Sequence, residues 1–280
     1  MIILDGKKLK EKNLLELKDK VSKLEDKLTL VVIQAGNDSA SNVYVNQKKK
    51  MADYVGYNFI YRKLDENVSQ DELLNIIDGY NKDSNVHGIL VQMPLPKHID
   101  EAVVQNKILY YKDVDGLSDI NMGRLVHNKD GLISCTPNGI LNLLEEYNID
   151  VSGKHVVVVG RSNLVGRPLA SLLLNRDATV TILHSKTKDI SYYTKAADIL
   201  IVAVGKKHLI KKDMVKDNAV VIDVGITLED GKLYGDVDFD NVKDKVSYIT
   251  PVPGGVGPMT VWALAFNVYK AYKLGCDDIE

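Results

Sequence analysis

The apolar residues of this chain alternate between short continuous runs and amphipathic stretches. Leu14, Leu17, Val21 and Leu24 recur at helical spacing, which predicts a helix over residues 7–26. The run LTLVVIQAG at 28–36 is rich in β-branched residues and ends in glycine, as a buried strand does. The same alternation continues through the first half of the chain. It predicts helices at 39–56 and 69–81 and strands at 57–64 and 86–96.

The second half repeats this scheme, with predicted helices at 138–147 and 166–175 and predicted strands at 155–159, 178–183, 197–205 and 219–226. Because strands alternate with helices, we expect parallel sheets with crossover connections. The stretch PVPGGVGPMT at 251–260 interrupts the pattern. The closing helix, from Thr260 to about Leu274, is too apolar on one side to stand alone and should pack onto the first half. The predicted fold class is therefore α/β, as two open α/β domains with a cleft between them, formed by residues 1–139 with 264–280 and by residues 140–263.

Composition narrows the class of partner. The chain has 280 residues, of which 45% are hydrophobic, and its 36 Lys and Arg nearly balance 38 Asp and Glu, for a net charge of -2. This balance favours small-molecule ligands and gives no sign of a nucleic-acid or membrane partner. Cys135 and Cys276 form no C-x-x-C motif, the N-terminus lacks a signal-peptide pattern, and no apolar run approaches the roughly 18 residues of a membrane helix. We expect a soluble cytoplasmic protein without a bound metal ion.

One loop of the second half has a dinucleotide-binding pattern with a substitution. In VVVVGRSNLVGRPLA, at 156–170, Gly160 ends a predicted strand, Ser162 stands where the usual pattern has its second glycine, and Gly166 follows late. A strand, a turn and a helix in this order direct backbone N–H groups and the helix dipole at an anion. The alternative is a plain turn in a doubly wound sheet.

The next predicted strand indicates which dinucleotide is bound. An NAD site usually has Asp or Glu after this strand to bind the ribose 2′-hydroxyl. Here the strand runs into His184, Ser185, Lys186 and Lys188, with no acid. Together with Arg161, these residues favour NADP over NAD, although a solvated basic loop would have the same composition.

The first half contains a second group of polar candidates. Tyr44 and Lys48 are four residues apart on a predicted helix and therefore share a face. Gln92 ends an apolar strand, where an amide normally needs a partner or a ligand. Asp113 and Asp115 precede a glycine and are either turn formers or ligand carboxylates. A tyrosine, a lysine, an amide and a carboxylate at one sheet edge could orient a flat, polar heterocycle. Spacing alone thus predicts an NADP-dependent oxidoreductase that acts on a small molecule.

Several motifs together resemble one family. They are SASNVYVNQKKKMADYVG, GILVQMPLP, KDVDGL, CTPNGI, GRSNLVGRP, HSKT, VIDVGI and PVPGGVGPMT, in this order along nearly the whole chain. The sequence resembles the bifunctional methylenetetrahydrofolate dehydrogenase/cyclohydrolase (FolD) family. The departures are Ser134, where the family commonly has proline, and Gln34, where relatives often differ. Neither falls on an expected catalytic position.

The resemblance implies two reactions of one-carbon metabolism. 5,10-Methylenetetrahydrofolate would be oxidised with NADP+ to 5,10-methenyltetrahydrofolate, which would then be hydrolysed to 10-formyltetrahydrofolate. It also implies a folate-binding catalytic domain (1–139 and 264–280), a Rossmann-like NADP-binding domain (140–263) and a homodimer formed through the latter. An amino-acid or shikimate-type NADP-dependent dehydrogenase would not need the VQMPLP and PGGVGP segments. A non-enzymatic NADP-binding regulator would not need Tyr44, Lys48 and Asp115 together.

The resemblance also assigns roles to residues. Lys48 would be the catalytic lysine, Tyr44 would line the folate site, Gln92 would position Lys48, and Asp115 would bind the pterin. Lys48 can manage a proton in hydrolysis only if part of its population is neutral. The substrate loop would contain Pro253, Gly254 and Gly255. The cofactor would be NADP, bound by Gly160, Arg161, Ser162, Val165, Gly166, Ser185, Thr187, Gly205, Gly225 and Ile226.

Overall fold

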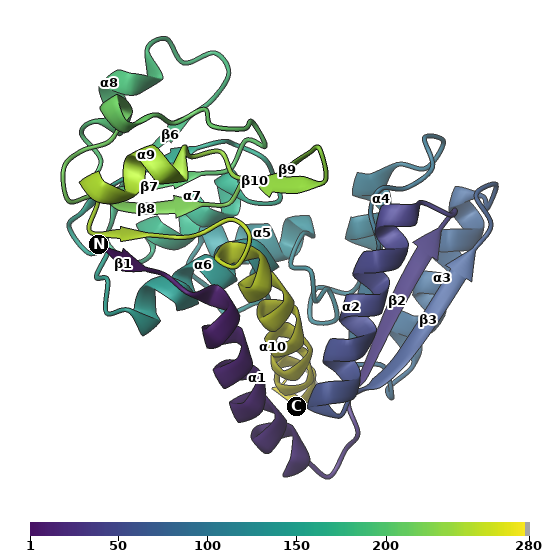
Figure 1. Cartoon of the computed structure of the whole chain (residues 1–280). Coiled ribbons are helices and arrows are strands. Elements are labelled where there is room, and N and C mark those ends of the chain that lie inside the picture. The colour runs from purple at the N-terminus through teal and green to yellow at the C-terminus, as the bar shows by residue number, and fades with distance from the viewer. Residues whose placement is uncertain (278–280) are drawn as a thin grey trace. The chain divides into compact units, whose positions relative to one another are not determined.

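The computed structural model describes residues 1–277, apart from the side chains of residues 39, 40, 276 and 277 (Figure 1). The side chain of Cys276 and residues 278–280 of the expected first domain lie outside the described residues. The chain divides into two compact units. Unit 1 contains Met1–Glu11 and Thr136–Thr260, and unit 2 contains Lys12–Cys135 and the chain from Val261 onward. No helix in the described part of the chain is long and apolar enough to cross a membrane.

Unit 2 is built around a three-stranded parallel sheet in the order β3-β2-β4. The middle strand is buried along its whole length, as the apolar run predicts. The strands are β2 (Thr29–Ala35), β3 (Asn58–Leu64) and β4 (Gly88–Val91). The helices of this unit are most of α1 (Gly6–Ser22), α2 (Ser39–Val55), α3 (Gln70–Lys82), α4 (Glu101–Lys107), α5 (Asp119–Val126) and most of α10 (Val256–Asp277).

Helix α2 follows the end of β2 and is fixed at both ends by local chemistry. The Asp38 side chain accepts a hydrogen bond from the backbone N–H of Ser41 at 2.7 Å, which caps the first turn. Gly56 ends the helix with φ 100°, in the left-handed region that favours glycine. These two caps set the helix on which Tyr44 and Lys48 are placed.

Unit 1 contains a six-stranded parallel sheet in the order β1-β11-β8-β7-β5-β6. Its strands are β1 (Ile2–Ile3), β5 (His155–Val159), β6 (Thr179–Leu183), β7 (Ile199–Val202), β8 (Val220–Asp223) and β11 (Tyr248–Ile249). Strands β9 (Thr227–Glu229) and β10 (Lys232–Tyr234) form an antiparallel hairpin. The helices are α6 (Cys135–Glu146) apart from its first residue, α7 (Gly166–Leu174), α8 (Ile190–Thr194) and α9 (Phe239–Val242), with 3-10 turns at Lys212–Met214 and Lys243–Lys245.

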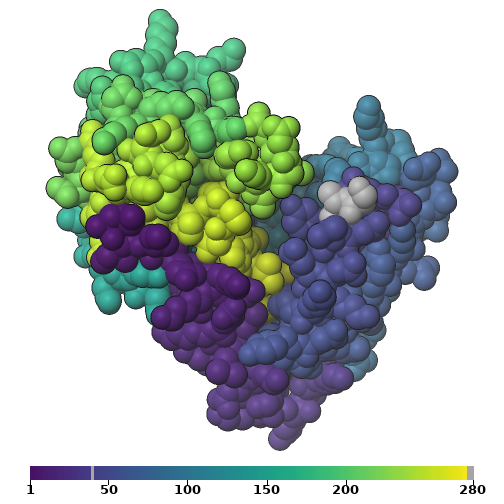
Figure 2. All heavy atoms as spheres, viewed as in Figure 1, coloured from purple at the N-terminus to yellow at the C-terminus, as the bar shows by residue number. Residues whose placement is uncertain are grey.

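The α/β class and the parallel pairing are confirmed, whereas some boundaries differ from the expectation. Residues 1–11 group with unit 1 and not with the first half, because β1 pairs with β11 through Ile2 and Tyr248. The side chains of Met1 to Ile3 are exposed, and Figure 2 shows this segment in darkest purple on the surface. Helix α10 begins at Val256, inside the stretch that was expected to interrupt the pattern.

The closing helix packs as expected. Beyond Val261 it belongs to unit 2 with residues 12–135. The hydroxyl of the buried Tyr57 donates a hydrogen bond to the Ala265 carbonyl at 2.9 Å, and the buried Asn267 side chain donates to the Val114 carbonyl at 2.9 Å. Helix α10 therefore completes the unit that contains Lys48.

Candidate functional site

Lys48 and Gln92 meet at the carboxyl end of the unit 2 sheet. The Lys48 Nζ atom donates to Gln92 Oε1 at 2.6 Å. The other atom of the amide, Gln92 Nε2, donates to the Met93 carbonyl at 2.7 Å, which fixes which way the amide faces. The buried amide at the end of β4 thus has partners on both sides, and one of them is the lysine of α2.

The charge state of Lys48 is set by burial and by Asp115. Burial lowers the pKa of Lys48 below its ordinary value of 10.5, and the negative charge of Asp115 acts in the opposite direction. Burial raises the pKa of Asp115 above its ordinary value of 3.8, and the positive charge of Lys48 acts against this. Burial thus disfavours the charged form of each group while the charge of the other favours it, so the neutral amine is more accessible than in a surface lysine.

Cys135 is a member of this cluster that the sequence reasoning did not assign. It begins α6, it is buried, and its Sγ atom lies 3.4 Å from the Val114 carbonyl oxygen. Burial, together with the nearby negative charge of Asp115, raises the pKa of this thiol, so it is protonated at neutral pH. The sequence signal that could have identified Cys135 was the motif CTPNGI, of which this cysteine is the first residue.

Asp113 and Asp115 of the KDVDGL segment have different partners and different roles. The buried Asp113 carboxylate accepts hydrogen bonds from the N–H of Gly116 at 3.1 Å and of Ser118 at 2.8 Å. It also accepts from Asn121 Nδ2 at 3.0 Å. Asp113 is therefore the turn former. Asp115, which the turn presents, interacts with Lys48 and Cys135.

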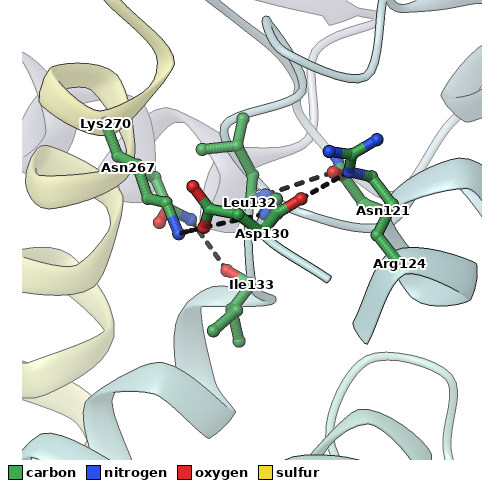
Figure 3. Close-up of polar contacts among 8 residues, drawn as sticks. Asn121, Arg124, Asp130, Leu132, Ile133, Asn267 and Lys270 are labelled. Carbon is green, nitrogen blue, oxygen red and sulfur yellow. Dashed lines mark hydrogen bonds and ion pairs between the residues drawn. The ribbon is translucent and has the colours of Figure 1, made fainter. Parts of the chain in front are cut away.

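Asn267 of α10 braces the two segments that hold Asp115 and Cys135. Its Nδ2 atom donates to the carbonyl of Val114, the residue before Asp115, at 2.9 Å. The same atom donates at 2.8 Å to the carbonyl of Ile133, which precedes Cys135 by two residues. Figure 3 shows this contact beside a second one from α10, the ion pair of Lys270 Nζ with Asp130 Oδ1 at 2.5 Å. Helix α10 thus holds the backbone next to Asp115 and the backbone next to Cys135.

Tyr44 and the proline–glycine loop are placed differently. Tyr44 lies one turn before Lys48 on α2, and its side chain is 53% exposed, so its ring is open to a ligand. Pro253, Gly254 and Gly255 belong to unit 1. There the Gly254 carbonyl accepts from the Lys7 N–H at 3.1 Å, and the Gly255 N–H donates to the Pro251 carbonyl at 2.9 Å.

The residues expected to bind NADP follow four neighbouring strands of unit 1. Gly160 follows β5, Ser185 follows β6, Gly205 follows β7 and Gly225 follows β8. In the strand order β8-β7-β5-β6, the chain leaves β5 toward β6 on one side and later returns to β7 on the other. Open α/β sheets bind ligands at the carboxyl edge beside such a reversal. The sheet thus brings these loops to one edge.

The turn after β5 is close-packed. Gly160 has φ +126°, and a Cβ atom there would lie 2.3 Å from the Ala203 carbonyl oxygen. A Cβ atom at Gly166 would lie 2.1 Å from the Gly160 carbonyl oxygen. The hydroxyl of Ser162 accepts from the Val165 N–H at 3.2 Å, so this serine shapes the turn. Val165 supplies no side-chain cap to α7, but the Arg167 N–H donates to the Ser162 carbonyl at 3.0 Å and Pro168 has no N–H, so the turn itself occupies most of the first helical donors.

The loop after β6 is closed by hydrogen bonds between its own residues. The His184 N–H donates to Thr187 Oγ1 at 3.0 Å, and the Thr187 N–H donates to the His184 carbonyl at 2.8 Å. Ser185 and Lys186 are exposed, as is Arg161 on the neighbouring turn. Residues 184–188 include no carboxylate. The loop is therefore compatible with the 2′-phosphate of NADP.

Two family models match the chain. Residues 4–115 match the catalytic domain of tetrahydrofolate dehydrogenase/cyclohydrolase. Residues 134–276 match the NAD(P)-binding domain of the same family. The Bifunctional protein FolD of Bacillus subtilis is 51% identical over 275 residues, which are 97% of this chain and 97% of that protein.

Solved structures agree. The bifunctional FolD methylenetetrahydrofolate dehydrogenase/cyclohydrolase of Campylobacter jejuni superposes with a TM-score of 0.97 at 48% identity, covering 98% of this chain and 99% of that one. The Trypanosoma brucei enzyme, complexed with NADP and an inhibitor, has a TM-score of 0.93 at 36% identity, covering 99% and 98%. A shikimate dehydrogenase from Aquifex aeolicus has a TM-score of only 0.53 at 16% identity, covering 91% of this chain and 98% of that one. It shares the fold alone. The shikimate-type alternative is therefore not favoured.

Proposed function

This chain belongs to the tetrahydrofolate dehydrogenase/cyclohydrolase family, and we propose that Lys48, Gln92 and Asp115 form its folate site. The protein is a bifunctional enzyme that oxidises 5,10-methylenetetrahydrofolate with NADP+ and hydrolyses the methenyl product to 10-formyltetrahydrofolate. The observation that carries the site is the 2.6 Å hydrogen bond between Lys48 Nζ and Gln92 Oε1, beside Asp115.

The two reactions make different demands on the chain. NADP+ supplies the hydride acceptor of the dehydrogenase reaction. The folate nitrogens stabilise the cation that forms, so the residues of this step need chiefly to align the substrate. Hydrolysis requires a water at the cationic carbon and a group that takes its proton. Lys48, with its lowered pKa and its position fixed by Gln92, is suited to hold that proton on Nζ.

The remaining roles at the folate site follow from side-chain chemistry. A pterin presents a ring N–H beside an exocyclic amine, and the carboxylate of Asp115 can accept both hydrogen bonds. Tyr44 offers an exposed, flat face to the aminobenzoyl ring. Pro253, Gly254 and Gly255 form the proposed substrate loop, whose two glycines let a ligand approach the backbone closely. Asp115 and Lys48 are thus assigned to different tasks, since Asp115 holds the substrate and Lys48 takes the proton of the attacking water.

The NADP site is assigned to the loops at the carboxyl edge of the unit 1 sheet. The close-packed turn at Gly160 and Gly166, which leads from β5 into α7, supports close approach of a pyrophosphate to the backbone there. Arg161 and Ser185 would bind the 2′-phosphate. The other contributing residues are Ser162, Val165, Thr187, Gly205, Gly225 and Ile226.

Arg161→Ala should raise the KM for NADP+ and leave that for NAD+ almost unchanged, because only NADP+ carries the phosphate that the guanidinium would bind. Steady-state dehydrogenase kinetics with both cofactors measure this. Arg167→Ala is a matched control, since Arg167 is also exposed but donates through Nε to the Arg161 carbonyl at 3.3 Å. Equal losses with both cofactors in Arg161→Ala would show that Arg161 supports the turn and does not bind the phosphate.

Assembly and location are further parts of the proposal. We assign the protein to the cytoplasm and expect a homodimer formed through unit 1. The sequence has two cysteines, and the buried Cys135 is a free thiol, which supports a reduced compartment. Light scattering coupled to gel filtration should give twice the chain mass of 31.1 kDa. A single-chain mass at micromolar concentration would refute the dimer.

The proposed function is tested by offering the purified chain NADP+ with either 5,10-methylenetetrahydrofolate or shikimate. NADPH should form only with the folate, and 10-formyltetrahydrofolate should be the final product by chromatography. NADPH formation with shikimate would support the alternative dehydrogenase. NADP+ binding without turnover of either compound would support a regulator.

A further inference from the structure

The loop after β7 is held by a buried carboxylate. Asp236, which is 0% exposed, accepts hydrogen bonds from three consecutive backbone N–H groups. They are those of Val204 at 2.7 Å, Gly205 at 3.1 Å and Lys206 at 2.6 Å. Three amides that converge on one point form an anion-binding nest. In this chain the anion in the nest is a side chain of the protein itself.

A second buried carboxylate holds the first in place. Asp223, at the end of β8, accepts from the backbone N–H of Asp236 at 2.9 Å and of Val237 at 2.9 Å. It also accepts from the Gly225 N–H at 3.2 Å. Burial raises the pKa of Asp223 to about 7, and the charge of Asp236 contributes to the rise. The two carboxylates together tie residues 204–206, 223–225 and 235–237 into one structure.

Two glycines make room for these carboxylates. A Cβ atom at Gly225 would lie 2.0 Å from Asp236 Cγ, and one at Gly235 would lie 1.9 Å from Asp223 Oδ2. Neither position can carry a side chain while the carboxylate stays where it is. The segments VIDVGI and GDVD are therefore matched parts of one arrangement, although they lie on either side of the β9–β10 hairpin.

Such an arrangement disfavours folding, because two carboxylates are removed from water close to each other. Its location indicates a role in ligand binding. The loop of Gly205 follows β7, the neighbour of β5 at the point where the strand order reverses, which is the ligand edge of the sheet. A vacant nest at this edge would compete with the turn at Gly160 for a phosphate group.

We propose that Asp236 is a positioning residue for the NADP site, whose carboxylate fixes the Val204–Lys206 loop in one conformation and denies the nest to the phosphates of the cofactor. Asp223 acts through Asp236. The inference rests on the proposed placement of Gly205 at the cofactor. With its N–H groups occupied, the loop offers the ligand its carbonyl oxygens and the Val204 side chain, which is 42% exposed.

Asp236→Asn tests the proposal, because an amide turns a donor toward at least one of the three N–H groups. Hydrogen exchange of the Val204–Lys206 amides in the protein without ligand should accelerate. The Kd of NADP+ alone, measured by calorimetry, should rise by up to about tenfold, because a loop that has lost a hydrogen bond to a charged group occupies the binding conformation for a smaller fraction of the time. The rate of methenyltetrahydrofolate hydrolysis, assayed without NADP+, should remain that of the wild type.

Asp198→Asn is the matched control. Asp198 precedes β7 at the opposite edge of the same sheet, where its carboxylate accepts from the His155 N–H at 3.0 Å and pairs with Lys216 Nζ at 2.6 Å. This variant should leave both NADP+ affinity and exchange in the 204–206 loop unchanged. A general loss of stability in unit 1 would instead affect both variants alike.

Asp223→Asn keeps the test open if Asp236→Asn does not fold. Both Asp223 oxygens accept backbone N–H groups, so this amide also turns a donor toward at least one of them, but it leaves the three hydrogen bonds of Asp236 to the loop in place. It should change exchange and Kd in the same direction but less. Faster exchange with wild-type NADP+ affinity, or unchanged exchange in both variants, would overturn the proposal. Failure of the wild-type enzyme to bind NADP+ would instead refute the assigned cofactor site.

Discussion

Replacing Lys48 by methionine should slow the hydrolysis of 5,10-methenyltetrahydrofolate by roughly 10² to 10⁴-fold, the usual contribution of a general acid or base. Methionine keeps the length and the apolar contacts of the side chain but has no atom that can hold a proton. The dehydrogenase reaction depends on alignment and should fall less. The methenyl compound should therefore accumulate, and its absorbance in a progress curve with NADP+ measures this directly.

The control for Lys48→Met is a lysine next to it in the sequence. Lys49 and Lys50 are exposed neighbours in the same run of three lysines, so Lys49→Met removes a charge without touching Gln92. It should leave both rates unchanged. If Lys48 is only a substrate anchor, both activities of Lys48→Met should decline together and recover at saturating folate. Wild-type hydrolysis in Lys48→Met would remove Lys48 from the mechanism.

Asp115→Ala should weaken folate binding by about tenfold to a hundredfold or more, because hydrogen bonds to a charged group are worth roughly 1.5 to 3 kcal/mol. NADP+ affinity should hardly change. Calorimetry with a folate substrate analogue and with NADP+ separates the two effects. Asp119→Ala is a control, since this nearby carboxylate is exposed at the start of α5.

The Asp115 variant has a second consequence. The charge of Asp115 opposes the lowering of the Lys48 pKa by burial, so its removal should lower that pKa further. The remaining hydrolysis at saturating folate should then reach its plateau at a lower pH than in the wild type. Unchanged folate affinity in Asp115→Ala would mean that this residue, like Asp113, serves the turn alone.

Local patterns were enough to predict part of the geometry of the proposed site. The spacing of Tyr44 and Lys48 placed both on one face of α2, and an amide at the end of an apolar strand indicated that Gln92 needs a partner. Both signals lie within one element. Asp113 and Asp115 could not be told apart in this way, because each precedes the same glycine. Their roles depend on Asn121, Lys48 and Cys135, which belong to other elements.

The features that sequence reasoning did not reach depend on contacts between distant segments. Strand β1 has two residues and is defined by pairing with β11. It is too short for a periodic pattern in the sequence to predict it. Asp236 binds the Val204 N–H across 32 positions, and Asn267 reaches the Val114 carbonyl across 153. Strand ends were overestimated at β4, β7 and β8, because the apolar runs continue into the loops that carry Gln92, Gly205 and Gly225.

The most direct test of the central claim is the pH dependence of methenyltetrahydrofolate hydrolysis, corrected for the uncatalysed reaction. Only the neutral form of Lys48 accepts a proton. The rate should therefore be low at pH values below the pKa of this residue and should rise as the pH passes through that pKa. Because burial lowers that pKa, the rising limb should lie below 10.5 in the wild type and be absent from Lys48→Met. The same limb in both enzymes would contradict the assignment of the proton to Lys48.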